Sequence, residues 1–190
     1  MIITRTPIEG VAIIDLQLRL DDRGFFARSF CREEFMAAGL QPLVEQGNQS
    51  FNHQAGTLRG MHLQVAPHPE TKLVRCIRGA IVDIIVDLRP ESPTRFQHVK
   101  VKLSADNRRA LYVPPYFAHG YQTLVDDTEV TYLVSGSYAP QAERGLRWND
   151  PQLGLPWPLP VSRISAKDAG WALLAYRDPA DFEPLTAVPA

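Results

Sequence analysis

Short runs in which apolar and polar residues alternate are the main feature of this 190-residue chain. In the segment 11–20 the even positions from 14 onward are apolar, whereas Asp15, Gln17 and Arg19 are polar. This period of two predicts a half-buried strand, and the sequence DDRG at 21–24 predicts a turn after it. The same reasoning predicts further strands at 57–64, 72–77, 80–88, 97–103, 120–125 and 128–138.

Two short helices are expected beside these strands. The first covers 32–38, with Glu33 and Glu34 in its first turn and Gly39 as its stop. The second covers 165–174 and begins after Ser165, which is expected to cap it. The tail 178–190 contains three prolines, and we expect it to pack loosely.

Many short strands joined by Gly-rich and Pro-rich turns are typical of a β-sandwich, a jelly roll or a β-barrel. The strands do not alternate regularly with helices, and no Gly-x-Gly-x-x-Gly sequence opens a helix. A dinucleotide-binding fold is therefore not expected. The length of the chain suits one domain that covers residues 1–190.

The charge of the chain gives it no reason to bind nucleic acid or an anionic membrane, because the formal net charge is only -1. No segment has the run of about 20 apolar residues that a membrane-spanning helix needs. The N-terminal sequence lacks the basic and then apolar pattern of a secretion signal. Cys31 and Cys76 have neither metal-binding nor redox spacing, so we expect the protein in a reducing cytoplasm.

A histidine and a lysine in strand-like segments are candidates for chemistry. Strict alternation places His62 on one face with Leu58, Gly60 and Gln64, where it is either a functional group or a hydrogen-bonded core histidine. Alternation places Lys72 on the inner, apolar face of its own strand. A buried lysine must be paired or functional, since an unpaired buried charge costs too much free energy.

Three other positions leave two interpretations open. Tyr132 shares a face with valines, so it is either a core tyrosine or a proton donor. His119 follows a Pro-Pro turn and lies either at the rim of a sheet or in a site. Arg59, like Arg23, is by default a surface charge, and alternation places it opposite His62. A β-bulge at Gly60 would be needed to bring Arg59 and His62 to one pocket.

Five segments of the chain are informative together: GTLRGMHLQ, KLVRCIRGAIVDIIVDLRPESPT, LYVPPYFAHGYQTL, ERGLRWNDPQLGLPWPL and ISAKDA. In this order and spacing they resemble the dTDP-4-dehydrorhamnose 3,5-epimerase family of cupins, and the likeness covers about residues 1 to 175. The resemblance implies an all-β fold, the cupin double-stranded β-helix or jelly-roll barrel with a few short helices. It also implies a homodimer that binds a nucleotide-sugar substrate and uses no metal or organic cofactor.

The implied activity is that of an isomerase. It would invert C3, C5 or both in a nucleotide-diphospho-4-keto-6-deoxyhexose, as in the formation of dTDP-4-dehydrorhamnose for polysaccharide synthesis. Position by position, the resemblance makes His62 the base, Asp168 the carboxylate that orients it, Tyr132 the acid on the opposite face of the sugar and Lys72 the lysine beside the keto oxygen. The implied substrate-binding residues are Arg23, Gln46, Asn48, Arg59, Lys72, His119, Glu143 and Lys167, with the arginines mainly at the diphosphate.

Three positions depart from the usual residues of the family. Gly47 replaces an aspartate, Arg28 replaces a glutamate that contacts substrate, and Leu63 replaces a tyrosine. Related enzymes act on C3 alone, on C5 alone or on other nucleotide sugars, and these alternatives stay open here.

Two other classes of protein also fit a cupin barrel. A metal-dependent cupin oxygenase or isomerase would use His62 and His119 as ligands. However, Gln64 stands where cupin metal sites have a second histidine, and Lys72 would place a cation beside the metal. A barrel that only binds sugar nucleotides would not need a base, an orienting carboxylate and an acid together.

Overall fold

The computed structural model describes residues 1–177 and 181, and most of its regular elements are strands. The strands are β1 (Ile2–Arg5), β2 (Ala12–Asp15), β3 (Arg19–Asp21), β4 (Gly24–Phe26), β5 (Gln46–Asn52), β6 (Leu58–Gln64), β7 (Lys72–Arg78), β8 (Ala80–Asp87), β9 (His98–Ser104), β10 (Ala110–Val113), β11 (Phe117–Thr123), β12 (Thr128–Val134) and β13 (Glu143–Gly145). The helices are α1 (Arg32–Ala37), α2 (Ala166–Ala169) and the 3-10 turns η1 (Pro140–Ala142) and η2 (Leu174–Tyr176). None of these helices has the length and apolar character needed to cross a membrane.

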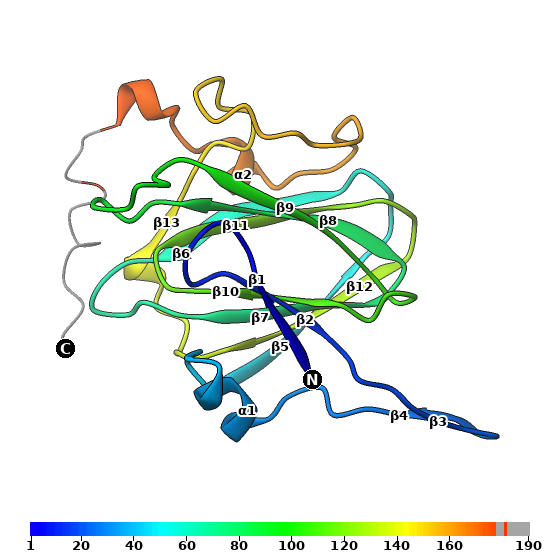
Figure 1. Ribbon diagram of the computed structural model, residues 1–190. Coiled ribbons are helices and arrows are strands. Elements are labelled where there is room, and N and C mark those ends of the chain that lie inside the picture. Colours follow the sequence, from blue (N-terminus) through cyan, green and yellow to red (C-terminus); the bar gives the residue numbers. More distant parts are fainter. Residues whose placement is uncertain (178–180, 182–190) are drawn as a thin grey trace.

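Two antiparallel sheets lie face to face, as the jelly-roll expectation requires (Figure 1). One has the strand order β1-β2-β10-β7-β12-β5 and the other the order β13-β6-β11-β8-β9. A buried apolar cluster between the sheets joins Val74 of β7 and Val130 of β12 to Ile81 and Ile85 of β8. Burial of this apolar surface is the main force that holds the sheets together.

The outer face of each sheet is also covered. Phe35 of α1 is buried against Ile14 and Tyr112 on the outside of the six-stranded sheet. Residues of the segment 139–155 pack with Ile84 on the outside of the five-stranded sheet. Because β8 is covered on both faces, every residue from 81 to 87 is buried, including the two aspartates of that run. This explains why β8 is almost continuously apolar in sequence.

A two-stranded hairpin, β3 and β4, extends away from the rest of the structure (Figure 1). The prediction of one strand over 11–20 was therefore wrong. The chain leaves the sheet after Asp15, and Leu20 and Phe26 of the hairpin are 76% and 67% exposed. Apolar alternation continues through the break, but the side chains beyond Ile14 do not face a core.

Other predicted boundaries differ for local reasons. The strand expected at 128–138 ends at Val134, where the backbone N–H of Ser135 instead donates to the carbonyl of Thr71. The helix expected at 165–174 is only one turn long and ends at Gly170, although Ser165 does cap it. Strands β1, β4, β5, β10 and β13 were not predicted. The tail 178–190 that we expected to pack loosely lies, except for Asp181, outside the described residues.

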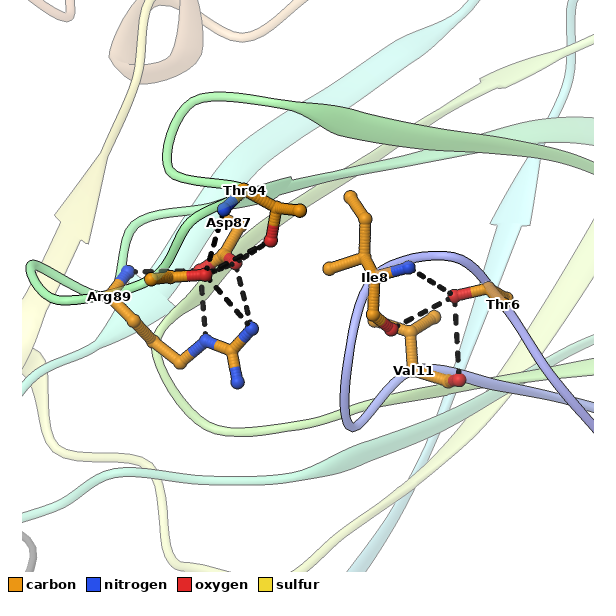
Figure 2. Close-up of polar contacts among 7 residues, drawn as sticks. Thr6, Ile8, Val11, Asp87, Arg89 and Thr94 are labelled. Carbon is orange, nitrogen blue, oxygen red and sulfur yellow. Dashed lines mark hydrogen bonds and ion pairs between the residues drawn. The ribbon is translucent and has the colours of Figure 1, made fainter.

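A buried carboxylate anchors the loop that follows β8 (Figure 2). Asp87 accepts hydrogen bonds from Arg89 Nη2 at 2.7 Å, Ser92 Oγ at 2.6 Å and Thr94 Oγ1 at 2.7 Å. Burial alone would raise the pKa of Asp87, but these donors outweigh it and the pKa is lowered. The Arg89 guanidinium also lies 4.9 Å from the ring centroid of Phe117, so one arginine connects the loop to β11.

Candidate active site

Two adjoining cavities open between the sheets. Their volumes are about 460 Å³ and 420 Å³, and His62, Lys72 and Tyr132 line both of them. These volumes lie within the usual range for small-molecule sites. His62 comes from the five-stranded sheet, whereas Lys72 and Tyr132 come from the six-stranded sheet. Side chains from both sheets therefore meet where the two cavities join.

His62 is held by a carboxylate from the short helix α2. Its Nε2 lies 2.6 Å from Asp168 Oδ1, while Asp168 Oδ2 accepts the backbone N–H of Gly60 at 3.1 Å. Burial alone would raise the pKa of Asp168, but the hydrogen bond and charge of His62 outweigh it and the pKa is lowered. Asp168 is thus a carboxylate at neutral pH. It leaves Nδ1 as the ring nitrogen of His62 that can accept a proton.

The bulge needed to bring Arg59 and His62 to one pocket is present in β6. His62 pairs with His119 of β11, whereas Arg59 pairs with Tyr121, so three steps along β6 match two along β11. The extra residue lies beside Gly60, whose φ is +117°. A bulge of this kind reverses the side-chain alternation, and Arg59 and His62 both line the larger cavity.

Two glycines bring β6 and β11 unusually close together beside this bulge. A Cβ atom built on Gly60 would lie 2.5 Å from Cα of Gly120, and one built on Gly120 would lie 2.6 Å from Sδ of Met61. Both distances are shorter than real Cβ contacts. The strand separation that places His62 beside His119 therefore requires glycine at both positions.

Lys72 and His119 each contact a carboxylate that is largely or completely buried. Lys72 Nζ lies 3.2 Å from Glu70 Oε1, with both side chains 12% exposed. His119 Nε2 lies 2.7 Å from Oδ1 of Asp83, which is completely buried on the inner face of β8. This second contact has the distance of an ion pair but not the angles of a hydrogen bond, and no described residue donates a hydrogen bond to Asp83. These two basic groups on the cavity wall thus each have an acidic neighbour behind them.

Tyr132 faces the cavities from β12. Burial raises the pKa of its hydroxyl, and this effect exceeds the opposing influence of Arg59. The phenol is therefore protonated at neutral pH and has a proton to donate. Tyr121 lies nearby on β11, and its hydroxyl is 2.8 Å from Ser50 Oγ.

The smaller cavity contains a cluster around Glu143. Glu143 Oε2 accepts hydrogen bonds from Lys167 Nζ at 2.5 Å and from Tyr138 Oη at 2.7 Å. Burial alone would raise the pKa of Glu143, but these two donors outweigh it and the pKa is lowered. Gln46 and Asn48 of β5 line the same cavity.

The predicted site residues are thus brought together with one exception. Ten of them line one or both of the two cavities: His62, Lys72, Arg59, His119, Lys167, Asp168, Tyr132, Gln46, Asn48 and Glu143. Arg23 lines neither of them. Its side chain is 84% exposed on the hairpin, where it pairs with Asp21 at 2.5 Å.

Sequence reasoning missed several residues of this site. Tyr121 and Arg163 line the larger cavity, and Asn52 and Asp83 lie behind its wall. Only Asp83 left a signal, as a charged residue between the apolar residues 80–82 and 84–86 of β8. The contacts of the others depend on the pairing of distant strands, which the sequence does not reveal.

The three departures from the usual family residues fall in different places. Leu63 is buried and lines the smaller cavity. A Cβ on Gly47 would make only an ordinary contact, 3.5 Å from Leu133, so a side chain would fit there. Arg28 lines neither cavity and lies 3.4 Å from Glu34 on the surface.

Metal donors do not gather in this part of the molecule. Within residues 1–177 and 181, no group of three or more His, Cys, Asp or Glu side chains is arranged to hold a metal ion. The two cavity histidines instead have Asp168 and Asp83 at their Nε2 atoms.

Comparison with known proteins gives a consistent result. The sequence model of the dTDP-4-dehydrorhamnose 3,5-epimerase family matches residues 5–176. The dTDP-4-dehydrorhamnose 3,5-epimerase of Salmonella typhimurium is 40% identical over 176 residues, which cover 92% of this chain and 96% of that protein. The dTDP-4-dehydrorhamnose 3-epimerase of Streptomyces niveus is 36% identical over 181 residues, which cover 95% and 87%.

A solved structure also matches over nearly its whole length. The crystal structure of the dTDP-6-deoxy-D-glucose-3,5-epimerase of Legionella pneumophila, in complex with dTDP-4-keto-L-rhamnose, superposes with a TM-score of 0.87 at 37% identity. The superposition covers 95% of each chain.

Proposed function

Because this chain belongs to the dTDP-4-dehydrorhamnose 3,5-epimerase family, we propose that it inverts C3 and C5 of dTDP-4-dehydro-6-deoxyglucose to give dTDP-4-dehydrorhamnose. The enzyme is an isomerase. The observation that carries this proposal is the position of His62 and Tyr132. They come from opposite sheets and line the same two cavities.

The proposed chemistry uses the substrate as its own electron sink. In a 4-ketohexose, C3 and C5 both flank the carbonyl group, so either C–H bond can break with the electrons moving into the carbonyl oxygen as an enolate. His62 Nδ1 takes the proton, and an imidazole suits this role because its ordinary pKa of about 6.5 lies near neutral pH. Asp168 fixes the ring and stabilises the imidazolium that forms.

Two side chains would stabilise the enolate oxygen. Lys72 lies on the wall shared by both cavities and carries an ammonium group, so it would offset negative charge as it develops on O4. His119 lies next to His62 in the sheet pairing and would add a second donor on that side. Tyr132 then returns a proton from the opposite face of the ring, which inverts the carbon.

The nucleoside diphosphate would extend from the sugar along the cavity walls. Arg59 and Lys167 line the larger cavity and would bind the phosphate oxygens. Gln46, Asn48 and Glu143 line the smaller cavity and would supply further polar contacts to the substrate. No organic cofactor or metal takes part in this scheme.

The position of Arg23 supports a homodimer. In one protomer Arg23 lies outside both cavities, on a hairpin whose Leu20 and Phe26 expose large apolar surfaces. Exposed apolar groups on a projecting segment are typical of a protein–protein contact. A second copy of the chain that buries this hairpin would receive Arg23 at its own diphosphate. The free thiols of Cys31 and Cys76 fit a reducing location such as the cytoplasm.

Deuterium exchange tests the proposed reaction. Wild-type protein incubated in deuterium oxide with dTDP-4-dehydro-6-deoxyglucose should label C3 and C5, as followed by NMR. His62→Ala should lose exchange at both carbons, because a positioned base typically accelerates proton transfer by about 10²–10⁴-fold. His98→Ala is the matched control, since this histidine lies on β9 and lines neither cavity. Full exchange in His62→Ala would refute the assignment of the base.

A single-centre epimerase is the second candidate, favoured by the likeness to the Streptomyces niveus 3-epimerase. The same NMR experiment separates the two candidates. Label and inversion at C3 alone would identify a 3-epimerase, whereas label and inversion at both carbons would identify a 3,5-epimerase.

A further inference from the structure

We propose that Asn52 is a positioning residue that holds Arg59 through a neutral amide, so that the full guanidinium charge faces the diphosphate of the substrate. This inference rests on the proposed function, because it assigns a role to a residue behind the proposed substrate-binding arginine. Asn52 and Arg59 line a third pocket next to the larger cavity, but Asn52 lines neither of the two main cavities.

The contact between Asn52 and Arg59 joins the two sheets. Arg59 extends from β6 of the five-stranded sheet, and its Nε–H donates to Asn52 Oδ1 of β5 at 2.8 Å. Its Nη2 lies at the outer limit of a hydrogen bond, 3.5 Å from the carbonyl of Phe51. Both acceptors are uncharged oxygens. The remaining N–H groups of this half-exposed fork are available for a ligand on the cavity side.

Asn52 is itself fixed in one orientation. Asn52 is only 3% exposed. Its Nδ2 donates to the carbonyl of Thr128 at 3.2 Å and to Tyr121 Oη at 3.4 Å. The Tyr121 hydroxyl is in turn held by Ser50. Because the amide nitrogen faces two oxygens, the amide oxygen must face Arg59. A buried network of this kind orients the arginine before any ligand arrives.

The lysines and the arginines that line the larger cavity have different kinds of partner. Lys72 lies 3.2 Å from Glu70, and Lys167 lies 2.5 Å from Glu143, so carboxylates offset both ammonium charges. Arg59, by contrast, is held by Asn52, and Arg163 Nε donates to the amide oxygen of Gln54 at 3.0 Å. In the described residues no carboxylate lies within ion-pair distance of either arginine.

Because of this difference, the positive charge that no carboxylate offsets lies where Arg59 and Arg163 line the cavity. A diphosphate gains most from a cation whose charge is not already neutralised by a protein carboxylate, since charge-assisted hydrogen bonds depend on that charge. An aspartate at position 52 would hold Arg59 at least as firmly but would cancel its charge. The amide of Asn52 orients the guanidinium of Arg59 without neutralising its charge.

A double-mutant cycle on dTDP binding tests the proposal, with the purified full chain and calorimetry as the measurement. Asn52→Ala should weaken dTDP binding about 10-fold in the wild-type background, as expected for loss of a hydrogen bond to a charged group. The same change should cost less than about 2-fold in an Arg59→Met background, because the residue it positions is gone. Equal losses in the two backgrounds would overturn the proposal.

Two further variants separate positioning from general stability. Gln49→Ala removes an amide from the exposed face of the same strand, where it bonds to Glu129, and should leave dTDP affinity unchanged. Asn52→Asp is nearly isosteric and should also weaken dTDP binding, with a shallower dependence on salt concentration. Wild-type affinity and wild-type salt dependence in Asn52→Asp would contradict the role of the neutral amide.

A measurement without ligand completes the test. The Arg59 Nε–H resonance in the ¹⁵N NMR spectrum should be protected from solvent exchange in the wild type and lose that protection in Asn52→Ala. An unprotected resonance in the wild type would contradict the proposal even if the reaction is correct. The reaction is tested separately by deuterium exchange into the sugar, so either proposal can fail while the other stands.

Discussion

Asp168 binds two different partners with its two carboxylate oxygens, the ring of His62 with one and the backbone N–H of Gly60 with the other. The N–H of Gly60 can only donate a hydrogen bond, so the oxygen that faces it must remain an acceptor. This constraint connects the bulge of β6 to the protonation state of His62. It also predicts which tautomer of His62 the substitution Asp168→Asn would favour.

Asp168→Asn should remove activity without disturbing the position of His62. The amide oxygen would stay on Gly60, which turns the amide NH₂ toward Nε2 and forces that nitrogen to become an acceptor. Nδ1 would then carry the ring proton and could no longer take one from the sugar. We expect kcat for deuterium exchange to fall by about 10²–10⁴-fold, which is the typical contribution of a positioned general base, because the histidine is held in the wrong tautomer. Asp106→Asn, an exposed control, should keep wild-type exchange, and equal rates in both variants would contradict this account.

Tyr132→Phe should separate exchange from inversion. The phenyl ring keeps the apolar contacts of Tyr132 with the inter-sheet core but has no proton to give. His62 should still remove and return protons on its own face, so deuterium should enter the sugar while little epimer forms. NMR of the recovered sugar measures both quantities. Parallel loss of exchange and inversion would show that Tyr132 does not act as the proton donor.

Mixed dimers test the placement of Arg23. If the hairpin of one protomer completes the site of the other, a dimer of one Arg23→Ala chain and one His62→Ala chain has one doubly altered site and one intact site. Co-expression with random pairing should then restore about a quarter of wild-type activity from two nearly inactive variants. If Arg23 acted within its own protomer, every site would carry one defect, and no activity would return.

Asp87 should make the stability of the protein depend on pH in the acidic range. Its pKa is lower in the folded chain than in the unfolded chain, so the unfolded state binds the proton first as the pH falls. The stabilisation from Asp87 is thus complete above about pH 5 and is lost as the pH falls through the folded pKa. At pH 7, Asp87→Asn should lower the free energy of unfolding by about 3 kcal/mol, as expected for a broken buried ion pair.

Urea titrations of the two proteins at pH 7 and at lower pH measure this effect. The difference between wild type and Asp87→Asn should shrink as the pH falls below about 5. A difference that stays constant over this range would mean that the carboxylate charge of Asp87 does not stabilise the loop.

Those parts of the fold that depend on apolar patterning were visible in the sequence. The strands now numbered β6 to β9 were predicted to within one residue at each end, because their apolar residues face a core. β11 and β12 were predicted as strands, but β11 begins three residues earlier than expected and β12 ends four residues earlier. β5 was missed, since its sequence QGNQSFN is polar and its inward side chains line a cavity instead of a core. A strand that forms the wall of a polar site does not have the pattern of a packed strand.

A site residue could be predicted from the sequence where its type was unusual for its place in a strand. It could not be predicted where its position depends on how two strands pair. Lys72 stood out as a cation on an apolar face, and the structure places it beside Glu70. The bulge that joins Arg59 to His62 follows from the pairing of β6 with β11, which a linear pattern does not encode. Arg23 was assigned to the site by resemblance alone, and one protomer does not bring it there.

The close approach of Gly60 and Gly120 limits how this enzyme can be redesigned or can diverge. A side chain at either position would separate the strands that carry His62 and His119, so both groups would move away from any bound sugar at once. Changes of sugar preference must therefore come from residues farther along the cavity walls. Libraries meant to broaden the range of substrates should vary those residues and keep both glycines constant.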